Sequence, residues 1–299
     1  MKDYKEYNYY RELIESHIMD FIPEIEPNSK TLYDSISYSL KNGGKRLRPA
    51  MLLAACELSG GDVNQAIPYA CAIEYIHTYS LIHDDLPSMD DDDIRRGAPT
   101  NHVVFGEAVA VLAGDGLLTS AFEAMNKDML IYFDNPELLK RRIRASYEIS
   151  KGAGCKGMVA GQIADIEAEN KSASKELIDY IHLNKTAMLM VAAVKAGAYL
   201  GGADRALVSN LEAYGENIGM AFQIADDIQD AAADGHARSN SSGSDSERGI
   251  PTYPKLYGMD ESRKRFTALI DNARRIIAPY YDNAEFFIEM ADMVVESAN

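Results

Sequence analysis

Two aspartate-rich clusters, each directly after an apolar stretch with helical spacing, constrain most strongly how this chain can fold. The first, at 84–93, contains six aspartates, and the second, DDIQD at 226–230, lies far along the sequence. The stretches that precede them, SLIH and GMAFQIA, are apolar. The carboxylates therefore fit the wall of a cavity better than an open surface.

The helix before the first cluster is expected to cover residues 68–85. Apolar and aromatic residues recur there at helical spacing, and Pro68 is expected in the first turn. Pro87 disfavours helical geometry at the residue before it, so the helix should end near Asp85. The negative end of the helix dipole would then act with the aspartates in favouring a cation.

The pairing of two acidic clusters indicates a site for hard divalent cations that hold a phosphorylated substrate. In the second cluster, Asp226 and Asp230 are four residues apart and share one helical face. Mg2+ prefers oxygen ligands and is usually bound by one or two carboxylates together with substrate phosphates. Either cluster alone is also consistent with a solvated acidic face or a loose calcium site, but the pair favours the shared metal site.

The composition is that of an ordinary globular protein, with 46 % hydrophobic and 25 % charged residues. The formal net charge of −16 disfavours binding to nucleic acid or anionic lipid. No apolar run approaches the ~20 residues of a membrane span, and the N-terminal MKDYKEYNYY lacks the core of a signal peptide. The cysteines, Cys56, Cys71 and Cys155, indicate neither a disulfide framework nor a zinc site. We expect a cytoplasmic protein.

Helical start and stop signals recur along most of the chain, whereas alternating strand patterns and hairpin signals are missing. We therefore predict an all-α fold, a single large helical bundle around a central cavity, with residues 1–299 forming one domain. Residues 234–249 are rich in Ser and Gly. They are expected to form a flexible loop near the active site.

The first cluster and its surroundings, EYIHTYSLIHDDLPSMDDDDIRRGAPT, resemble the first aspartate-rich motif of trans-prenyltransferases. The DDxxxxD spacing is similar to that of bacterial farnesyl diphosphate synthases. The resemblance extends nearly from end to end, through GGKRLRP at 43–49, LAGDGLLTSAF at 112–122, GMVAGQIADIEAE at 157–169, NKTAM at 184–188, FQIADDIQD at 222–230 and TYP at 252–254.

The resemblance implies the isoprenoid synthase fold and a Mg2+-dependent prenyltransferase. In that reaction an allylic diphosphate (dimethylallyl or geranyl) ionises at its C–O bond, isopentenyl diphosphate attacks through its double bond, and a proton is lost. The departing diphosphate builds up negative charge, which cations already aimed at it stabilise. The resemblance also implies three Mg2+ ions, with Mn2+ as an alternative, a homodimer, and farnesyl diphosphate as the product.

Site residues are carried over by the same resemblance. The metal ligands are Asp84, Asp85, Asp90, Asp226, Asp227 and Asp230. Arg95 contacts the allylic diphosphate, and isopentenyl diphosphate is held by Lys45, Arg48, His77 and Arg96. The residues at the reacting centre are Lys185, Thr186 and Gln223, of which Lys185 and Gln223 also bind substrate. Tyr79 and Ser80, about one turn before Asp84, stop the growing tail and set its length. Asp115 and Asp165 are weaker candidates.

Without the resemblance, these residues have plainer interpretations. Lys45 and Arg48 fit an ordinary solvated loop, and His77 fits a packing role. Arg95 fits a local ion pair with the preceding aspartates, and Tyr79 fits the hydrophobic core. The resemblance favours the functional interpretation of each.

Three departures from the family pattern bear on activity. The positions that usually hold two lysines after the second cluster are Asn240 and Ile250, the NKT segment lacks a flanking basic residue and glycine, and the sequence ends without a basic tail. Fewer cations would weaken diphosphate binding. A low-activity or non-catalytic paralogue or partner subunit is therefore kept as an alternative. A geranylgeranyl-producing synthase is a separate alternative, which concerns product length. A terpene cyclase is disfavoured, because it has no isopentenyl diphosphate for GGKRLRP to bind.

Overall fold

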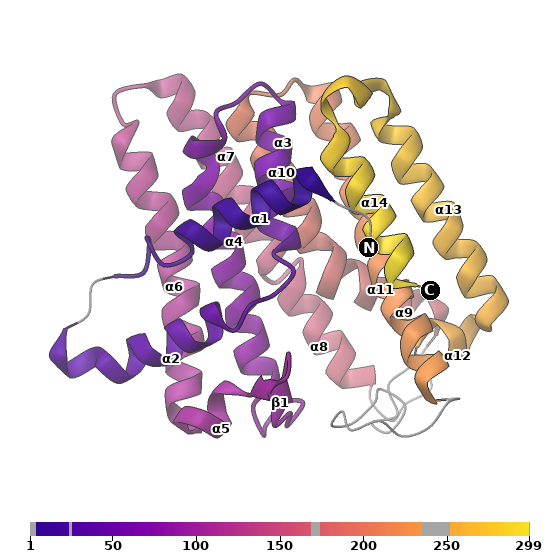
Figure 1. The fold of residues 1–299 in the computed structure, drawn as a ribbon, viewed down its shortest axis with the longest axis horizontal. Coiled ribbons are helices and arrows are strands. Elements are labelled where there is room, and N and C mark those ends of the chain that lie inside the picture. The colour runs from indigo at the N-terminus through magenta and orange to yellow at the C-terminus, as the bar shows by residue number, and fades with distance from the viewer. Residues whose placement is uncertain (1–3, 24–25, 169–173, 235–251, 299) are drawn as a thin grey trace.

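The computed structural model describes residues 4–23, 26–168, 174–234 and 252–298. Its architecture is all-α, which confirms the predicted fold class (Figure 1). Within the described residues, strands are limited to the antiparallel pair β1 (Ile94–Arg95) and β2 (Ala98–Pro99), which follows the first aspartate cluster.

The helices fall into three groups along the chain. Before the first cluster lie α1 (Lys5–His17), η1 (Pro27–Ser29), α2 (Lys30–Lys41), α3 (Leu47–Leu58) and α4 (Val63–Asp84). Between the clusters lie α5 (Asn101–Phe105), α6 (Glu107–Ile131), α7 (Pro136–Ala153), α8 (Met158–Ala168), α9 (Lys175–Ile181), the π-helical turn η2 (His182–Ala187) and α10 (Met188–Gly201). The second cluster lies in α11 (Arg205–Asp234), which is followed by α12 (Tyr253–Tyr257), α13 (Met259–Ile277), η3 (Ala278–Asn283) and α14 (Glu285–Ser297).

The bundle is organised around α10, in which every residue except Met188 and Tyr199 is buried. It packs against α3, α7 and α11 (Figure 1), and contacts of Gly215 with Val191 and of Gly219 with Ala187 show that α11 runs antiparallel to it. Small residues allow this packing: a Cβ added at Gly197 would overlap the Leu52 carbonyl oxygen of α3. One hydrophobic cluster connects the buried residues from α1 to α14. The assignment of residues 1–299 to one domain stays a prediction.

The helix that leads to the first cluster, α4, begins earlier than expected. Asp62 caps it by accepting a hydrogen bond from the Asn64 backbone nitrogen, at 3.0 Å, so Pro68 lies inside the helix. The expectation that Pro68 occupies the first turn is therefore wrong, because the cap precedes it. The other end agrees with the sequence: α4 ends at Asp84, and Asp85 is its C-cap residue.

Two helical segments, 107–131 and 175–201, are long and apolar enough to cross a membrane by length and composition alone. Their most apolar windows are 44 % and 67 % buried within the protein, and core helices of soluble proteins pass the same test. They are weak grounds for a membrane span. The predicted flexible loop covers residues 234–249, and of these the structure describes only residue 234. Asn240 and Ile250 therefore lie outside the described residues.

Candidate active site

The two aspartate clusters face one polar cavity of about 710 Å3. Asp84, at the end of α4, and Asp226, within α11, both line it. The first cluster folds back on itself, since the Asp90 backbone nitrogen donates to the Asp84 carbonyl oxygen at 2.8 Å. This turn brings Asp90 to the same cavity as Asp84, so the first and last aspartates of the DDxxxxD motif line one cavity.

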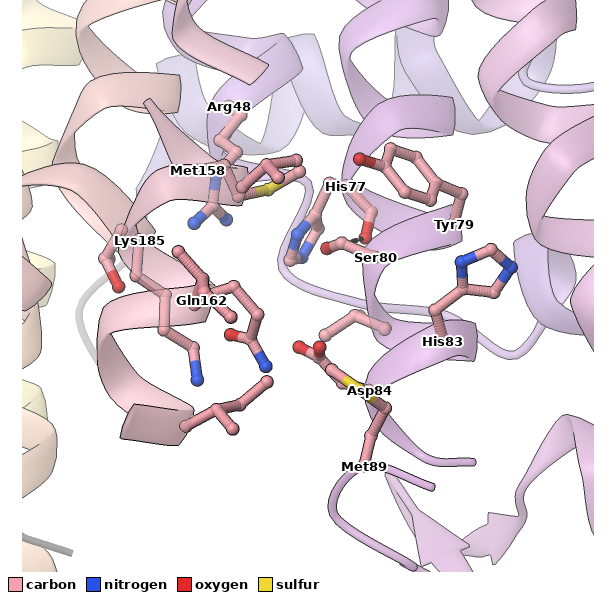
Figure 2. Close-up of a pocket in the computed structure, with 15 residues that line it drawn as sticks. Arg48, His77, Tyr79, Ser80, His83, Asp84, Met89, Met158, Gln162 and Lys185 are labelled. Atoms are coloured by element: carbon pink, nitrogen blue, oxygen red, sulfur yellow. Dashed lines mark hydrogen bonds between the residues drawn. The ribbon is translucent and has the colours of Figure 1, made fainter. Parts of the chain in front are cut away.

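A second cavity, of about 360 Å3, adjoins the polar one and is mostly apolar. The α8 side chains Met158, Val159, Ile163 and Ile166 line it opposite α4. The two cavities share a set of lining residues, which are Arg48, His77, Leu81, Asp84, Lys185 and Thr186. In Figure 2, Lys185 and Gln162 reach from one wall toward Asp84 on the other. The junction of the two cavities is therefore polar and carries both signs of charge.

The structure brings most of the predicted site residues together. Those that line the polar cavity are Lys45, Arg48, His77, Asp84, Asp90, Arg95, Arg96, Lys185, Thr186, Gln223 and Asp226. Tyr79 and Ser80 line the apolar cavity. Asp85, Asp227 and Asp230 line neither of these cavities, nor does Asp115, which is exposed on α6. Their predicted roles, like those of the other residues, stay predictions.

Asp85 and Asp227 are both buried and are held by other protein groups. Arg95 Nε donates to Asp85 Oδ1 at 2.6 Å. The Tyr253 backbone nitrogen donates to Asp227 Oδ2 at 2.7 Å, and the Gln223 side-chain amide donates to Asp227 Oδ1 at 3.3 Å. In this conformation these two carboxylates orient their neighbours, whereas Asp84 and Asp226 face the cavity.

Basic side chains form the wall next to α3. Burial lowers the pKa of the Arg48 guanidinium to about 10, and its buried Nε has no hydrogen-bond partner in the described part of the chain. Burial, with Arg48 and Arg96 nearby, also holds the pKa of His77 well below its usual value, so its imidazole is neutral. An anion entering here would relieve the repulsion between these cations and satisfy their donors.

The aspartates of the cavity have the opposite character. Burial raises the pKa of Asp84 to about 6, and the pKa of Asp226 to about 7. Nearby carboxylates add to both shifts: Asp90 acts on Asp84, and Asp230 acts on Asp226. Bringing a cation between them would reverse these shifts, since an opposite charge favours the ionised carboxylate.

These oxygen donors fit Mg2+. In the residues that the structure describes, no group of three or more acidic, histidine or cysteine side chains is arranged to hold a metal ion. Mg2+ is commonly bound by one or two carboxylates and completed by substrate phosphates and water, so it needs no all-protein cage. Asp84 and Asp90 on one wall and Asp226 on the other are suitably placed side chains for such shared binding.

The π-helical turn η2 supplies polar groups to the junction of the cavities. Lys185 Nζ donates to Asp165 Oδ2 at 2.5 Å, which gives the weaker candidate Asp165 a role in orienting this lysine. Thr186 donates its hydroxyl proton to Gln223 Oε1 at 2.8 Å and so connects η2 to α11. A π-helical turn often marks a functional site, because it rotates side chains out of the regular helical register.

Sequence reasoning missed Gln162, whose amide points into the junction toward Asp84 (Figure 2). The available signal was a single amide within the apolar segment GMVAGQIA. It also missed Arg46 and Glu74, a buried ion pair beside the polar cavity, with 2.6 Å between Arg46 Nη1 and Glu74 Oε1. No local pattern distinguishes Arg46 from its neighbours in KRLR.

Comparison with known proteins gives matches over most of the chain. The polyprenyl synthetase family profile matches residues 29–278. The chain is 43 % identical to a farnesyl diphosphate synthase of Geobacillus stearothermophilus, over 90 % of this chain and 89 % of that sequence. It is 42 % identical to a geranylgeranyl diphosphate synthase of Cyanophora paradoxa, over 97 % of this chain and 94 % of that sequence.

A solved structure shows the same architecture. The apo crystal structure of an FPP/GFPP synthase from Zymomonas mobilis superposes with a TM-score of 0.85 at 33 % identity, covering 97 % of both chains. The chain therefore belongs to the polyprenyl synthetase family, as its resemblance to trans-prenyltransferases predicts. Its class is that of a short-chain prenyl diphosphate synthase with the isoprenoid synthase fold.

Proposed function

We propose that this protein condenses isopentenyl diphosphate with an allylic diphosphate, dimethylallyl or geranyl, to form farnesyl diphosphate and release diphosphate. The observation that carries the proposal is the pair of joined cavities. One carries aspartates on two walls together with basic side chains and is suited to two diphosphates, and the other is apolar and suited to a prenyl tail. The two meet at Asp84 and Lys185, where the reacting carbons would lie.

The charges of the polar cavity suggest how the substrates divide it. The allylic diphosphate would lie between Asp84, Asp90 and Asp226, with Arg95 beside it, because its tail can then enter the apolar cavity. Isopentenyl diphosphate would lie against Lys45, Arg48, His77 and Arg96. The planar guanidinium of arginine matches phosphate oxygens and suits this second position.

Bound Mg2+ would supply positive charge against the leaving diphosphate, held by Asp84, Asp90 and Asp226. Asp85, Asp227 and Asp230 complete the proposed set of ligands, and three ions, with Mn2+ as an alternative, are part of the proposal. Lys185 adds a fixed positive charge at the same junction, and Asp165 orients it. Fixed charges aimed at the leaving group lower the barrier because they need no reorganisation during reaction.

In the reaction, the allylic C–O bond breaks and its electron pair leaves with diphosphate. The double bond of isopentenyl diphosphate then forms the new C–C bond, and a proton is lost. Thr186 and Gln223, joined by a hydrogen bond, present oxygen atoms beside the junction where the positive charge develops. The apolar lining from α8 would exclude water, which would otherwise capture the cation.

Farnesyl diphosphate is favoured as the product by Tyr79, which lines the apolar cavity and is 9 % exposed. Its ring would lie in the path of a lengthening tail. Relatives include both farnesyl and geranylgeranyl synthases, so a geranylgeranyl product is the second candidate. We further propose a cytoplasmic homodimer, for which exposed apolar side chains on α5 and α6, such as Val104 and Leu112, offer a surface.

The test is incubation of the purified protein with Mg2+, labelled isopentenyl diphosphate and each allylic diphosphate in turn, followed by separation of the products by chain length. A C15 product supports the proposal, and a C20 product supports the second candidate. Absence of any elongated product at millimolar Mg2+ would leave the non-catalytic paralogue or partner subunit as the better description.

A further inference from the structure

The loop between α2 and α3 carries Lys45 and leads directly to Arg48, yet its own backbone is poorly suited to holding a fixed shape. Gly43 and Gly44 have φ of +77° and +145°, and Arg46 has φ of +47°. A left-handed conformation is unfavourable for a residue with a side chain. Contacts from elsewhere in the protein must therefore keep this loop in place.

Two of these contacts come from the N-terminal helix α1. The Tyr7 hydroxyl donates to the Lys45 carbonyl oxygen at 2.6 Å. Glu15, two turns further along α1, accepts from Arg46 Nε at 2.8 Å. Consecutive loop residues are thus attached to the same helix, one through its backbone and the other through its side chain.

The Arg46 side chain completes the attachment. It is 2 % exposed, and all three of its guanidinium nitrogens donate to protein groups. Nη1 donates to Glu74 of α4, and Nη2 donates to the Leu40 carbonyl oxygen of α2. Arg46 therefore ties α1, α2 and α4 to the loop, and its nitrogens are engaged within the protein.

On the other side of the loop, the Lys45 ammonium lies 5.3 Å from the centre of the Phe222 ring on α11. Phe222 is four residues before Asp226, so the lysine lies close to the helix that carries the second aspartate cluster. A shift of the Lys45 backbone would move its ammonium relative to this wall.

We infer that α1 is a positioning element for the isopentenyl diphosphate site: Tyr7 and Glu15 hold the Lys45–Arg46 backbone so that Lys45 and Arg48 point at the diphosphate. The inference rests on the proposed function of that site. Neither Tyr7 nor Glu15 lines the polar cavity, so both act through the loop. Loss of either contact should weaken isopentenyl diphosphate binding and leave the allylic site unchanged.

The first test is Tyr7→Phe, which removes one hydroxyl and keeps the ring. One lost hydrogen bond should raise the KM for isopentenyl diphosphate on the order of two- to tenfold. The KM for the allylic diphosphate and kcat should change by less than about twofold. The matched control is Tyr9→Phe, on the same helix, whose ring is 52 % exposed and which should leave all three constants unchanged.

Glu15 provides a graded second test. Glu15→Gln keeps an oxygen acceptor for Arg46 Nε, whereas Glu15→Leu removes it. The KM for isopentenyl diphosphate should therefore rise more in the leucine variant than in the glutamine variant. Equal KM values in the two variants would contradict a role for this acceptor.

A double variant separates positioning from general structural damage. In a Lys45→Ala background the ammonium is already absent. Adding Tyr7→Phe should then raise the KM for isopentenyl diphosphate only by the smaller effect that a displaced Arg48 would cause. Full additivity of the two changes, or an equal rise in both substrate KM values, would overturn the inference. So would a lowered urea midpoint with unchanged KM, since that is the signature of a purely structural contact.

Calorimetric titration with isopentenyl diphosphate keeps this test independent of turnover. If wild-type protein binds the compound and Tyr7→Phe binds it more weakly, the inference stands even where no elongated product forms. If wild-type protein makes product and Tyr7→Phe binds as tightly as wild type, the proposed function stands and this inference fails.

Discussion

Asp84 and Asp226 differ from the other aspartates because both are desolvated and face the same cavity. Replacing either with asparagine keeps the size and removes the charge that would hold Mg2+. We expect each single variant to lose on the order of 10^2-fold or more in kcat, comparable to the loss of about 3 kcal/mol of transition-state stabilisation. Steady-state kinetics at millimolar Mg2+ measures this.

The matched control for these variants is Asp93→Asn. Asp93 belongs to the first cluster but is exposed and lines neither cavity. It should retain near wild-type kcat. Near wild-type kcat in Asp84→Asn or Asp226→Asn, with normal folding by circular dichroism, would contradict a site shared by the two clusters.

Tyr79 permits a prediction about product length. Its ring lies edge-on to the His83 ring, with 5.7 Å between the ring centres, and lines the apolar cavity. Tyr79→Ala removes the ring and should shift products from C15 to C20 or longer. Tyr79→Phe keeps the ring and should leave the distribution unchanged. Chromatography of the dephosphorylated products measures their chain lengths. Identical profiles for both variants would show that Tyr79 is an ordinary core residue.

At the element scale, the close approach of α4 and α6 depends on Gly114. His83 Nε2 lies 3.0 Å from the Val111 carbonyl oxygen of α6, and a Cβ at Gly114 would overlap the His83 ring. Gly114→Ala should therefore displace His83 and, through it, Tyr79. We expect a loss of about 1–3 kcal/mol in the free energy of unfolding, measured with urea, and a changed product length.

Gly116 offers the control on the same helix. A Cβ there would lie 3.2 Å from Ile36 Cδ1, the end of a flexible side chain, so Gly116→Ala should be accommodated. Its stability should be closer to wild type, and its products should be unchanged. If both alanine variants behave alike, then His83 does not depend on the α4–α6 approach.

Helix α4 and the aspartate clusters include features that could be predicted from the sequence and features that could not. The end of α4 at Asp84 was predictable because Pro87 acts locally, and the DDxxxxD motif identified the cluster. The start of α4 was not, because the Asp62 cap outweighed the signal from Pro68. Likewise, Asp85 and Asp227 each accept a hydrogen bond from a residue on another element, Arg95 and Tyr253 respectively. Such contacts depend on packing between distant segments.

For the whole molecule, the net charge of −16 disfavours anionic substrates only when it is treated as uniform. The polar cavity gathers basic side chains from three places in the sequence: Lys45 with Arg48, Arg95 with Arg96, and Lys185. Carboxylates line the same cavity, and neighbouring carboxylates repel one another. The fold thus gathers both signs of charge around one cavity, and an anion together with a metal cation would neutralise both.

The presence of both charges in one cavity predicts cooperative stabilisation by metal and diphosphate. Mg2+ and inorganic diphosphate added together should raise the thermal unfolding midpoint by more than the sum of their separate effects, because each neutralises charge that opposes the other. A ligand at 100 times its Kd stabilises the native state by about 2.7 kcal/mol. For a chain of this size that corresponds to roughly 5 °C.

The control is the double variant Asp84→Asn with Asp226→Asn. Its thermal shift with Mg2+ and diphosphate together should equal the sum of the separate shifts, and its response to diphosphate alone should be retained. Additive shifts in the wild-type protein would show that metal and diphosphate bind at separate places, and would contradict the shared cavity as their common site.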